Sequence, residues 1–242
     1  MRVLVVQHDH LSSPGFVGER LEQRGWDVVT HLIVGENDFH TPGVQTELPD
    51  ATRFDAVIAM GAPWSTYDDE LIGSWVVPET ELLRAADTEG VPVLGICFGG
   101  QLLASAHGGT VRASGLPEVG WFDVDSDDET LVPAGAWFQW HYDCWTTPPG
   151  ADEVARNSAG SQAFVLRRNL AVQFHPELTT DILLGWLANG GTEKAAEFGH
   201  DPLELINMTR SLEPDARRRA HRLADAFLDR VATRPPDRTR AV

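Results

Sequence analysis

The stretch Val93-Leu94-Gly95-Ile96-Cys97-Phe98-Gly99-Gly100-Gln101 runs from an apolar segment through a cysteine into paired glycines. This order is typical of a buried strand that turns sharply into a helix, the place where α/β hydrolytic enzymes carry their nucleophile. A thiol attacks as the thiolate, and the positive end of a helix favours an anion. We therefore predict that Cys97 is a nucleophile. A small buried core residue is the alternative, because free cysteine is among the most buried residue types.

A histidine and a carboxylate follow a second apolar strand, in Gln173-Phe174-His175-Pro176-Glu177. Residues i and i+2 of a strand point to the same side, so Glu177 is expected beside the imidazole of His175. A histidine oriented by a carboxylate is the base that activates a nucleophile. Cys97, His175 and Glu177 thus supply a nucleophile, a general base and acid, and an orienting carboxylate.

Short apolar strands alternate with helical segments along the first part of the chain. We expect strands at 3–7, 27–32, 56–60 and 91–96, with helices at 15–24, 78–89 and 100–107. The helix at 78–89 is expected to begin at Pro78, because proline suits a first turn. This alternation predicts an α/β fold with a doubly wound, mostly parallel, flavodoxin-like sheet and helices on both faces.

The pattern changes after Gly108. Shorter strands, some of them antiparallel, are expected at 120–124, 136–140, 162–166 and 170–174. A helix at 179–188 and a last amphipathic helix from about Pro214 to Val231 complete the prediction.

Composition excludes several classes of function. The net charge of −17 argues against nucleic acid as a partner, because phosphate binding needs clustered cations. No apolar run approaches the roughly 18 residues of a membrane helix, so we expect a cytoplasmic protein without membrane contacts. Two cysteines, Cys97 and Cys144, are too few for a disulfide scaffold. His8 and His10 lack the ligand cluster that would complete a metal site, so no metal is predicted.

The two motifs together resemble the triad-type class I glutamine amidotransferases, of the stand-alone, GMP-synthase-amidotransferase-like kind. The resemblance covers about residues 1–188. Three further segments are similar to family motifs: the loop 60–65 for an oxyanion-hole amide, 117–121 for a Glu-hydrophobic-Gly segment, and 140–143 for a His-x-Asp loop. It implies a class I amidotransferase-like domain over 1–190 and a C-terminal helical extension over 191–242.

The resemblance also implies roles for individual residues. The backbone amides of Ala62 and Phe98 would form the oxyanion hole, and no cofactor is needed. The residues expected to contact the substrate are Gly61, Gln101, His141, Tyr142 and Asp143. One departure concerns the oxyanion loop: the family usually has Gly-Gly-Pro where this chain has Gly61-Ala62-Pro63, and the alanine puts the geometry of that donor in question.

The activity implied by the resemblance is hydrolysis of the side-chain amide of glutamine through a Cys97 thioester, which releases ammonia for transfer. The chain contains no synthetase domain and no Gly-x-x-x-x-Gly-Lys-Ser/Thr loop. We therefore expect either a separate ammonia-accepting synthase subunit or a stand-alone hydrolase, and the sequence is compatible with a homo-oligomer.

Two other functions stay open. A γ-glutamyl peptidase or amide hydrolase acting on conjugates would keep the same triad, and Trp64, Trp140 and Trp145 would line a pocket for a bulkier group. The alternative for these tryptophans is core packing, since they bury large areas wherever they can. A non-catalytic binding or regulatory module with the same fold is the third reading.

Overall fold

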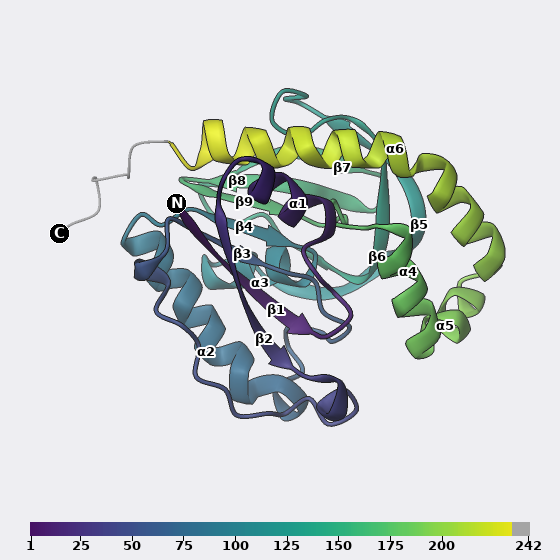
Figure 1. The fold of residues 1–242 in the computed structure, drawn as a ribbon, viewed down its shortest axis with the longest axis horizontal. Helices are drawn as coiled ribbons and strands as arrows, with labels where there is room; N and C mark the ends of the chain where they lie inside the picture. Colours follow the sequence, from purple (N-terminus) through teal and green to yellow (C-terminus); the bar gives the residue numbers. More distant parts are fainter. Residues whose placement is uncertain (234–242) are drawn as a thin grey trace.

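The computed structural model describes residues 1–233, and Figure 1 shows its central sheet between helices. Five parallel strands form one half of the sheet, in the order β2-β1-β3-β4-β9. They are β1 (Arg2–Asp9), β2 (Asp27–Val34), β3 (Ala56–Ala59), β4 (Val93–Ile96) and β9 (Asn169–Val172). Every residue of β3, β4 and β9 is buried, as expected for parallel strands covered on both faces. The prediction of a doubly wound, mostly parallel sheet is confirmed.

Antiparallel strands extend the sheet beyond β9, in the order β8-β7-β5-β6. They are β8 (Gly160–Leu166), β7 (Asp152–Asn157), β5 (Val111–Ser126) and β6 (Gly135–Trp145). β5 and β6 are much longer than the sequence predicts, and their register shifts between Ala113 and Glu118. β7 was not predicted, because this strand, half of whose residues are exposed, has no apolar alternation.

Helices cover both faces of the sheet (Figure 1). α1 (Gly15–Gln23) and α6 (Pro202–Ala226) pack on the face that receives Val3 and Val5 of β1. α2 (Asp69–Thr88) and α3 (Phe98–Ala106) pack on the opposite face. The shorter helices α4 (Thr180–Trp186) and α5 (Thr192–Glu197) share a third cluster with Phe138. Successive residues of one strand therefore enter different cores, which is the period of two expected of a strand.

The long C-terminal helix α6 packs into the main core. Leu223 and Ala224 belong to the same buried cluster as Val3 of β1. Asp225 receives hydrogen bonds from Arg20 and Arg24 around α1, at 2.6–2.9 Å. The predicted boundary near residue 190 stays a prediction, and residues 234–242 of the expected extension lie outside the described residues.

Two helices begin earlier than predicted. The helix expected from Pro78 begins at Asp69, and the helix expected from about Pro214 begins at Pro202. Both prolines lie inside their helices, where each removes a backbone hydrogen bond. Burial of Trp75 in the turn before Pro78 and of Thr209 in the turn before Pro214 accompanies the longer helices. Tertiary packing thus outweighs the local preference of proline for a first turn.

Within residues 1–233, none of the helices combines the length and the hydropathy that spanning a bilayer requires.

Leu223 tests how much α6 contributes to the fold. The Leu223→Ala substitution should lower the free energy of unfolding by about 2–5 kcal/mol, because it leaves a cavity in a fully buried position. Leu203 on the same helix is 68% exposed, so Leu203→Ala is the matched control and should change it by less than about 0.5 kcal/mol. Urea unfolding followed by circular dichroism measures both, and equal effects would contradict the packing described here.

Candidate active site

Cys97 occupies a strained turn between β4 and α3. Its backbone lies at φ 50° and ψ −107°, in the left-handed half of conformational space that residues with side chains rarely enter. Neighbouring strands hold this turn: the Cys97 amide donates to the Val172 carbonyl at 2.8 Å, and the Gly99 amide donates to the Met60 carbonyl at 3.0 Å. Strained backbone persists only where surrounding structure determines it, and such positions gather at functional sites.

Close backbone approach explains the glycines around Cys97. A Cβ atom on Gly99 would lie 2.2 Å from the Ala59 carbonyl oxygen, and one on Gly95 would lie 2.6 Å from the Gly99 carbonyl oxygen. No side chain fits at either position. The Gly-x-Cys-x-Gly pattern therefore allows α3 to start directly against the end of β3, with the sulfur at the carboxyl edge of the sheet.

His175 and Glu177 form a buried pair at the end of β9. The Nδ1 atom of His175 lies 2.8 Å from Oε1 of Glu177, and the carboxylate is fully buried. The predicted proximity holds but its stated reason was wrong: β9 ends at Val172, so both residues lie in the turn beyond the strand. The Phe16 amide at the start of α1 donates to the Glu177 carbonyl at 3.1 Å, which ties this turn to the helix.

The charges around His175 favour its protonated form. Burial alone would lower the pKa of His175, but the negative charges of Glu177 and Cys97, with the hydrogen bond between the ring and Glu177, hold this pKa well above its ordinary value. Because Nδ1 contacts Glu177, Nε2 is the ring nitrogen of His175 that is available to interact with Cys97. The surroundings of His175 therefore suit an imidazolium beside the cavity that Cys97 also lines.

A cavity of about 340 Å³ opens at this edge of the sheet, lined by Cys97 and His175. The predicted oxyanion-hole and substrate residues all line it as well: Gly61, Ala62, Phe98, Gln101, His141, Tyr142 and Asp143. Glu177 lies behind His175 and outside the lining. The structure therefore brings together residues that follow β3, β4 and β9 and residues of β6.

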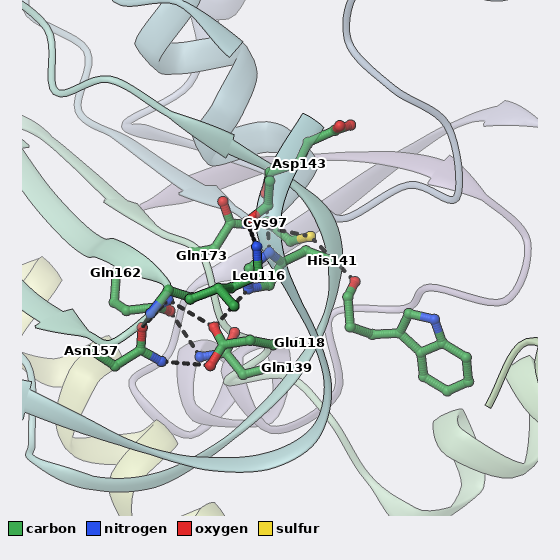
Figure 2. Close-up of polar contacts among 12 residues, drawn as sticks. Cys97, Leu116, Glu118, Gln139, His141, Asp143, Asn157, Gln162 and Gln173 are labelled. Atoms are coloured by element: carbon green, nitrogen blue, oxygen red, sulfur yellow. Dashed lines mark hydrogen bonds and ion pairs between the residues drawn. The ribbon is translucent and has the colours of Figure 1, made fainter. Parts of the chain in front are cut away.

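A buried polar network continues from the sulfur of Cys97. Gln173 Nε2 lies 3.6 Å from the sulfur, and Gln101 Nε2 lies 3.3 Å from the side-chain oxygen of Gln173 and 3.4 Å from the Asp143 carbonyl. Figure 2 shows Gln173 beside Cys97. Gln173 was part of the quoted sequence motif, but only the fold shows that its side chain reaches the cysteine.

His141 and Asp143 are held by contacts within the protein. The two ring nitrogens of His141 lie 3.0 Å from the Asp143 carbonyl oxygen and 3.1 Å from Glu118, the glutamate of the 117–121 segment (Figure 2). The Asp143 carboxylate accepts hydrogen bonds from Ser65 at 2.6 Å and Tyr67 at 2.8 Å. His141 therefore supports the cavity wall through Asp143, which sequence reasoning did not foresee.

Several lining residues carry no recognisable sequence signal. Asp9 at the end of β1, Trp186 of α4 and Lys194 of α5 line the cavity from distant parts of the chain. Of the three predicted tryptophans, Trp64 and Trp140 line it, whereas Trp145 packs in the core with its ring 5.5 Å from that of Phe164. The core alternative thus holds for Trp145.

Comparisons with known proteins identify a family and relatives that are similar in sequence. Residues 18–182 match the family model described as Glutamine amidotransferase class-I. The chain is 31% identical over 198 residues to a glutamine-hydrolyzing GMP synthase of Aeropyrum pernix. The matched region covers 72% of this chain and 37% of that protein. It is 34% identical over 163 residues to a glutamine-hydrolyzing GMP synthase subunit of Sulfolobus acidocaldarius. This matched region covers 61% of this chain and 83% of that protein. The chain therefore spans little more than a third of the full-length synthase.

Solved structures agree on the fold. A glutamine amido transferase from Methylobacillus flagellatus superimposes with a TM-score of 0.80 at 26% identity, covering 94% of each chain. A glutamine amidotransferase from Thermotoga maritima gives a TM-score of 0.81 at 22% identity, covering 95% of this chain and 98% of that one.

The Glu177→Gln substitution should lower the pKa of His175. It removes the negative charge that favours the imidazolium and leaves the opposing effect of burial in place. NMR titration of the His175 ring protons measures this directly. Asp152→Asn, an exposed site on β7, is the control and should leave the pKa of His175 unchanged. A pKa that stays the same or rises in Glu177→Gln would contradict the described pairing.

Proposed function

This chain belongs to the class I glutamine amidotransferase family, and on that basis we propose that it hydrolyses the side-chain amide of glutamine through a thioester on Cys97. One observation carries the proposal: a cysteine on a strained turn, a histidine with a raised pKa and a buried carboxylate meet beside a single cavity. Such a set is the constellation of a nucleophile, its base and an orienting group.

The first step forms a bond between the Cys97 sulfur and the amide carbon of the substrate. The thiolate supplies the electron pair, and the carbonyl π electrons move onto oxygen. The resulting oxyanion needs preorganised donors, a role that we assign to the backbone amides of Ala62 and Phe98. Both residues line the cavity, and Phe98 is the first residue of α3.

The second step breaks the bond between carbon and nitrogen. The oxyanion electrons return to the carbonyl, the bonding pair leaves with the nitrogen, and the imidazolium of His175 donates the proton that completes ammonia. A γ-glutamyl thioester remains on Cys97. Glu177 keeps the His175 ring oriented by its contact of 2.8 Å to Nδ1.

Water completes the cycle. Neutral His175 takes a proton from a water molecule as its oxygen attacks the thioester carbon, and the sulfur leaves as the thiolate. The products are glutamate and ammonia, and the imidazolium and thiolate are restored. The net reaction consumes one glutamine and one water.

The lining of the cavity suits an amino-acid substrate. Lys194 is the only lysine in the sequence, and its Nζ lies 5.1 Å from the centre of the Tyr142 ring. Its one acidic contact among the described residues is Glu197, which is 61% exposed and easily displaced. We assign Lys194 to the α-carboxylate of the substrate.

Ammonia released in the cavity would serve an acceptor. The relative from Sulfolobus acidocaldarius is named as one subunit of a synthase, so we propose a separate acceptor protein for this chain as well. A stand-alone hydrolase that releases ammonia to solvent is the competing form of the same proposal.

The aromatic wall of the cavity favours a second candidate, hydrolysis of γ-glutamyl conjugates. Trp64, Trp140 and Trp186 line a space of about 340 Å³, within the range of about 300–1,000 Å³ of small-molecule sites. Ammonia as leaving group makes no use of such a wall, whereas an apolar or aromatic amine would pack against it.

The Cys97→Ala substitution tests both candidates. It should abolish release of ammonia and glutamate from glutamine, and release of amine from a γ-glutamyl anilide, because no thioester can form. Cys144→Ala is the matched control, since this second thiol is outside the cavity lining, and it should retain turnover. Turnover that survives Cys97→Ala would refute the mechanism, and binding of glutamine without turnover by the wild-type chain would support a binding module.

The Lys194→Met substitution should raise KM for glutamine by about tenfold with little change in kcat, because a lost charge-assisted contact is worth about 1.5–3 kcal/mol and this site is partly exposed. Lys194→Arg should restore most of the affinity. Lys194→Met should leave KM for 4-aminobutanamide unchanged, because this compound lacks the α-carboxylate. Equal losses for both substrates would refute the assignment.

A further inference from the structure

A third histidine–glutamate pair lies behind the oxyanion loop. His8, near the end of β1, is fully buried, and its Nε2 lies 3.0 and 2.9 Å from the two carboxylate oxygens of Glu79 on α2. Its other ring nitrogen, Nδ1, lies 3.1 Å from the carbonyl oxygen of Gly61. Glu79 is also fully buried. The mechanism above uses neither residue, and burying two ionisable groups is costly unless they pair with each other, as these do.

Aromatic neighbours fix the ring of His8. The Trp75 ring stacks on it at a centroid distance of 5.5 Å and an interplanar angle of 26°, and the Phe98 ring meets it edge-on at 4.8 Å. A ring that is packed on two sides and bonded at both nitrogens has one available orientation. His8 therefore presents Nδ1 to the oxyanion loop as a fixed group.

The partners of the His8 ring determine whether Nδ1 carries a proton. A carbonyl oxygen only accepts hydrogen bonds, so Nδ1 must hold a proton to bond Gly61. Nε2 then either donates to the Glu79 carboxylate or accepts the proton of a carboxylic acid. Burial alone would lower the pKa of His8, but the charge of Glu79 and its hydrogen bond, with the Gly61 carbonyl, outweigh it and raise this pKa. Both arrangements leave a donor aimed at Gly61.

The carbonyl of Gly61 and the amide of Ala62 belong to the same peptide group. In a trans peptide these two dipoles point in opposite directions, and no cis peptide occurs in the described chain. Since the Gly61 oxygen points to His8, the Ala62 N–H points away from it. A Cβ on Gly61 would lie 3.1 Å from Cε1 of His175 and 3.8 Å from Cβ of Cys97, so this segment also borders the reacting groups.

We propose that His8, held by Glu79, is a positioning residue that locks the Gly61–Ala62 peptide with the Ala62 amide turned toward the oxyanion formed at Cys97. The proposal rests on the proposed amide hydrolysis. The proposal is compatible with an alanine at position 62, because a peptide whose carbonyl is held by His8 does not depend on the backbone freedom of a glycine there.

Two substitutions of His8 separate the two ring nitrogens. The amide nitrogen of asparagine reaches the position of Nδ1, so His8→Asn retains the donor to Gly61. The amide of glutamine reaches the position of Nε2, so His8→Gln retains the contact with Glu79 and loses the one with Gly61. Mispositioning of a catalytic donor by about 1 Å costs about 100-fold in rate. We expect kcat to fall about 10- to 100-fold in His8→Gln and less than about fivefold in His8→Asn, with KM for glutamine unchanged in both.

The rate at which iodoacetamide alkylates Cys97 separates a positioning role from a structural one. If His8 only supported the structure around Cys97, its substitution would change this rate as well. Alkylation forms no oxyanion, so its rate should be the same in His8→Gln and the wild-type chain while kcat differs. His31→Gln on β2, whose ring contacts Thr46 outside the cavity, is the control and should keep both rates. Equal losses of kcat in the two His8 variants, a rise in KM, or slowed alkylation would overturn the proposal.

Ring-nitrogen NMR of the wild-type chain gives a test that does not depend on the folding of any variant. It should show a protonated, slowly exchanging Nδ1 on His8, and an unprotonated Nδ1 would overturn the proposal. Wild-type protein that hydrolyses neither glutamine nor a γ-glutamyl anilide would refute the proposed function and this inference together. Turnover by the wild-type protein, together with equal kcat values for His8→Gln and His8→Asn, would refute the inference alone.

Discussion

The contact of α3 with the end of β3 is the constraint on which the rest of the site depends. Gly99 lies so close to the Ala59 carbonyl oxygen that a Cβ atom on residue 99 would clash with it. This contact requires a tight turn, in which Cys97 adopts a left-handed backbone conformation. The contact sets the thiol at the carboxyl edge of the parallel strands, next to the loop that follows β3. In open α/β sheets this edge is where ligands bind, because the loops after the strands converge there.

Buried polar groups then hold other parts of the site in place around this turn. Glu177 orients His175, and Glu118 holds His141, which in turn contacts the Asp143 carbonyl. Glu79 with His8 forms a third pair of the same kind. Each carboxylate is nearly or fully buried and paired with a histidine, so each satisfies hydrogen bonds that would otherwise be lost on folding. The same kind of pair therefore occurs at the turn after β9, between β5 and β6, and between β1 and α2.

Local signals predicted the parallel half of the molecule well and the helix starts poorly. Continuous apolar runs such as Ala56–Ala59 and Val93–Ile96 identify strands because both faces are covered. Pro78 and Pro214 misled the prediction, since proline favours a first turn but is tolerated inside a helix when buried neighbours hold the helix in place. The proximity of His175 and Glu177 was predicted from strand alternation but arises in a turn, so a correct contact came from an incorrect reason.

The sequence by itself determined the family, the doubly wound sheet and the candidate triad, because glycine spacing, apolar runs and the His-Pro-Glu segment are local patterns with few alternatives. Only the tertiary structure decided which distant side chains surround the triad. Asp9, Trp186 and Lys194 enter the cavity, and His8 meets Gly61, through contacts between elements that lie 50 or more residues apart or beyond the family match. Such contacts leave no periodicity in the sequence, since packing depends on shape and on the partner element rather than on neighbouring residues.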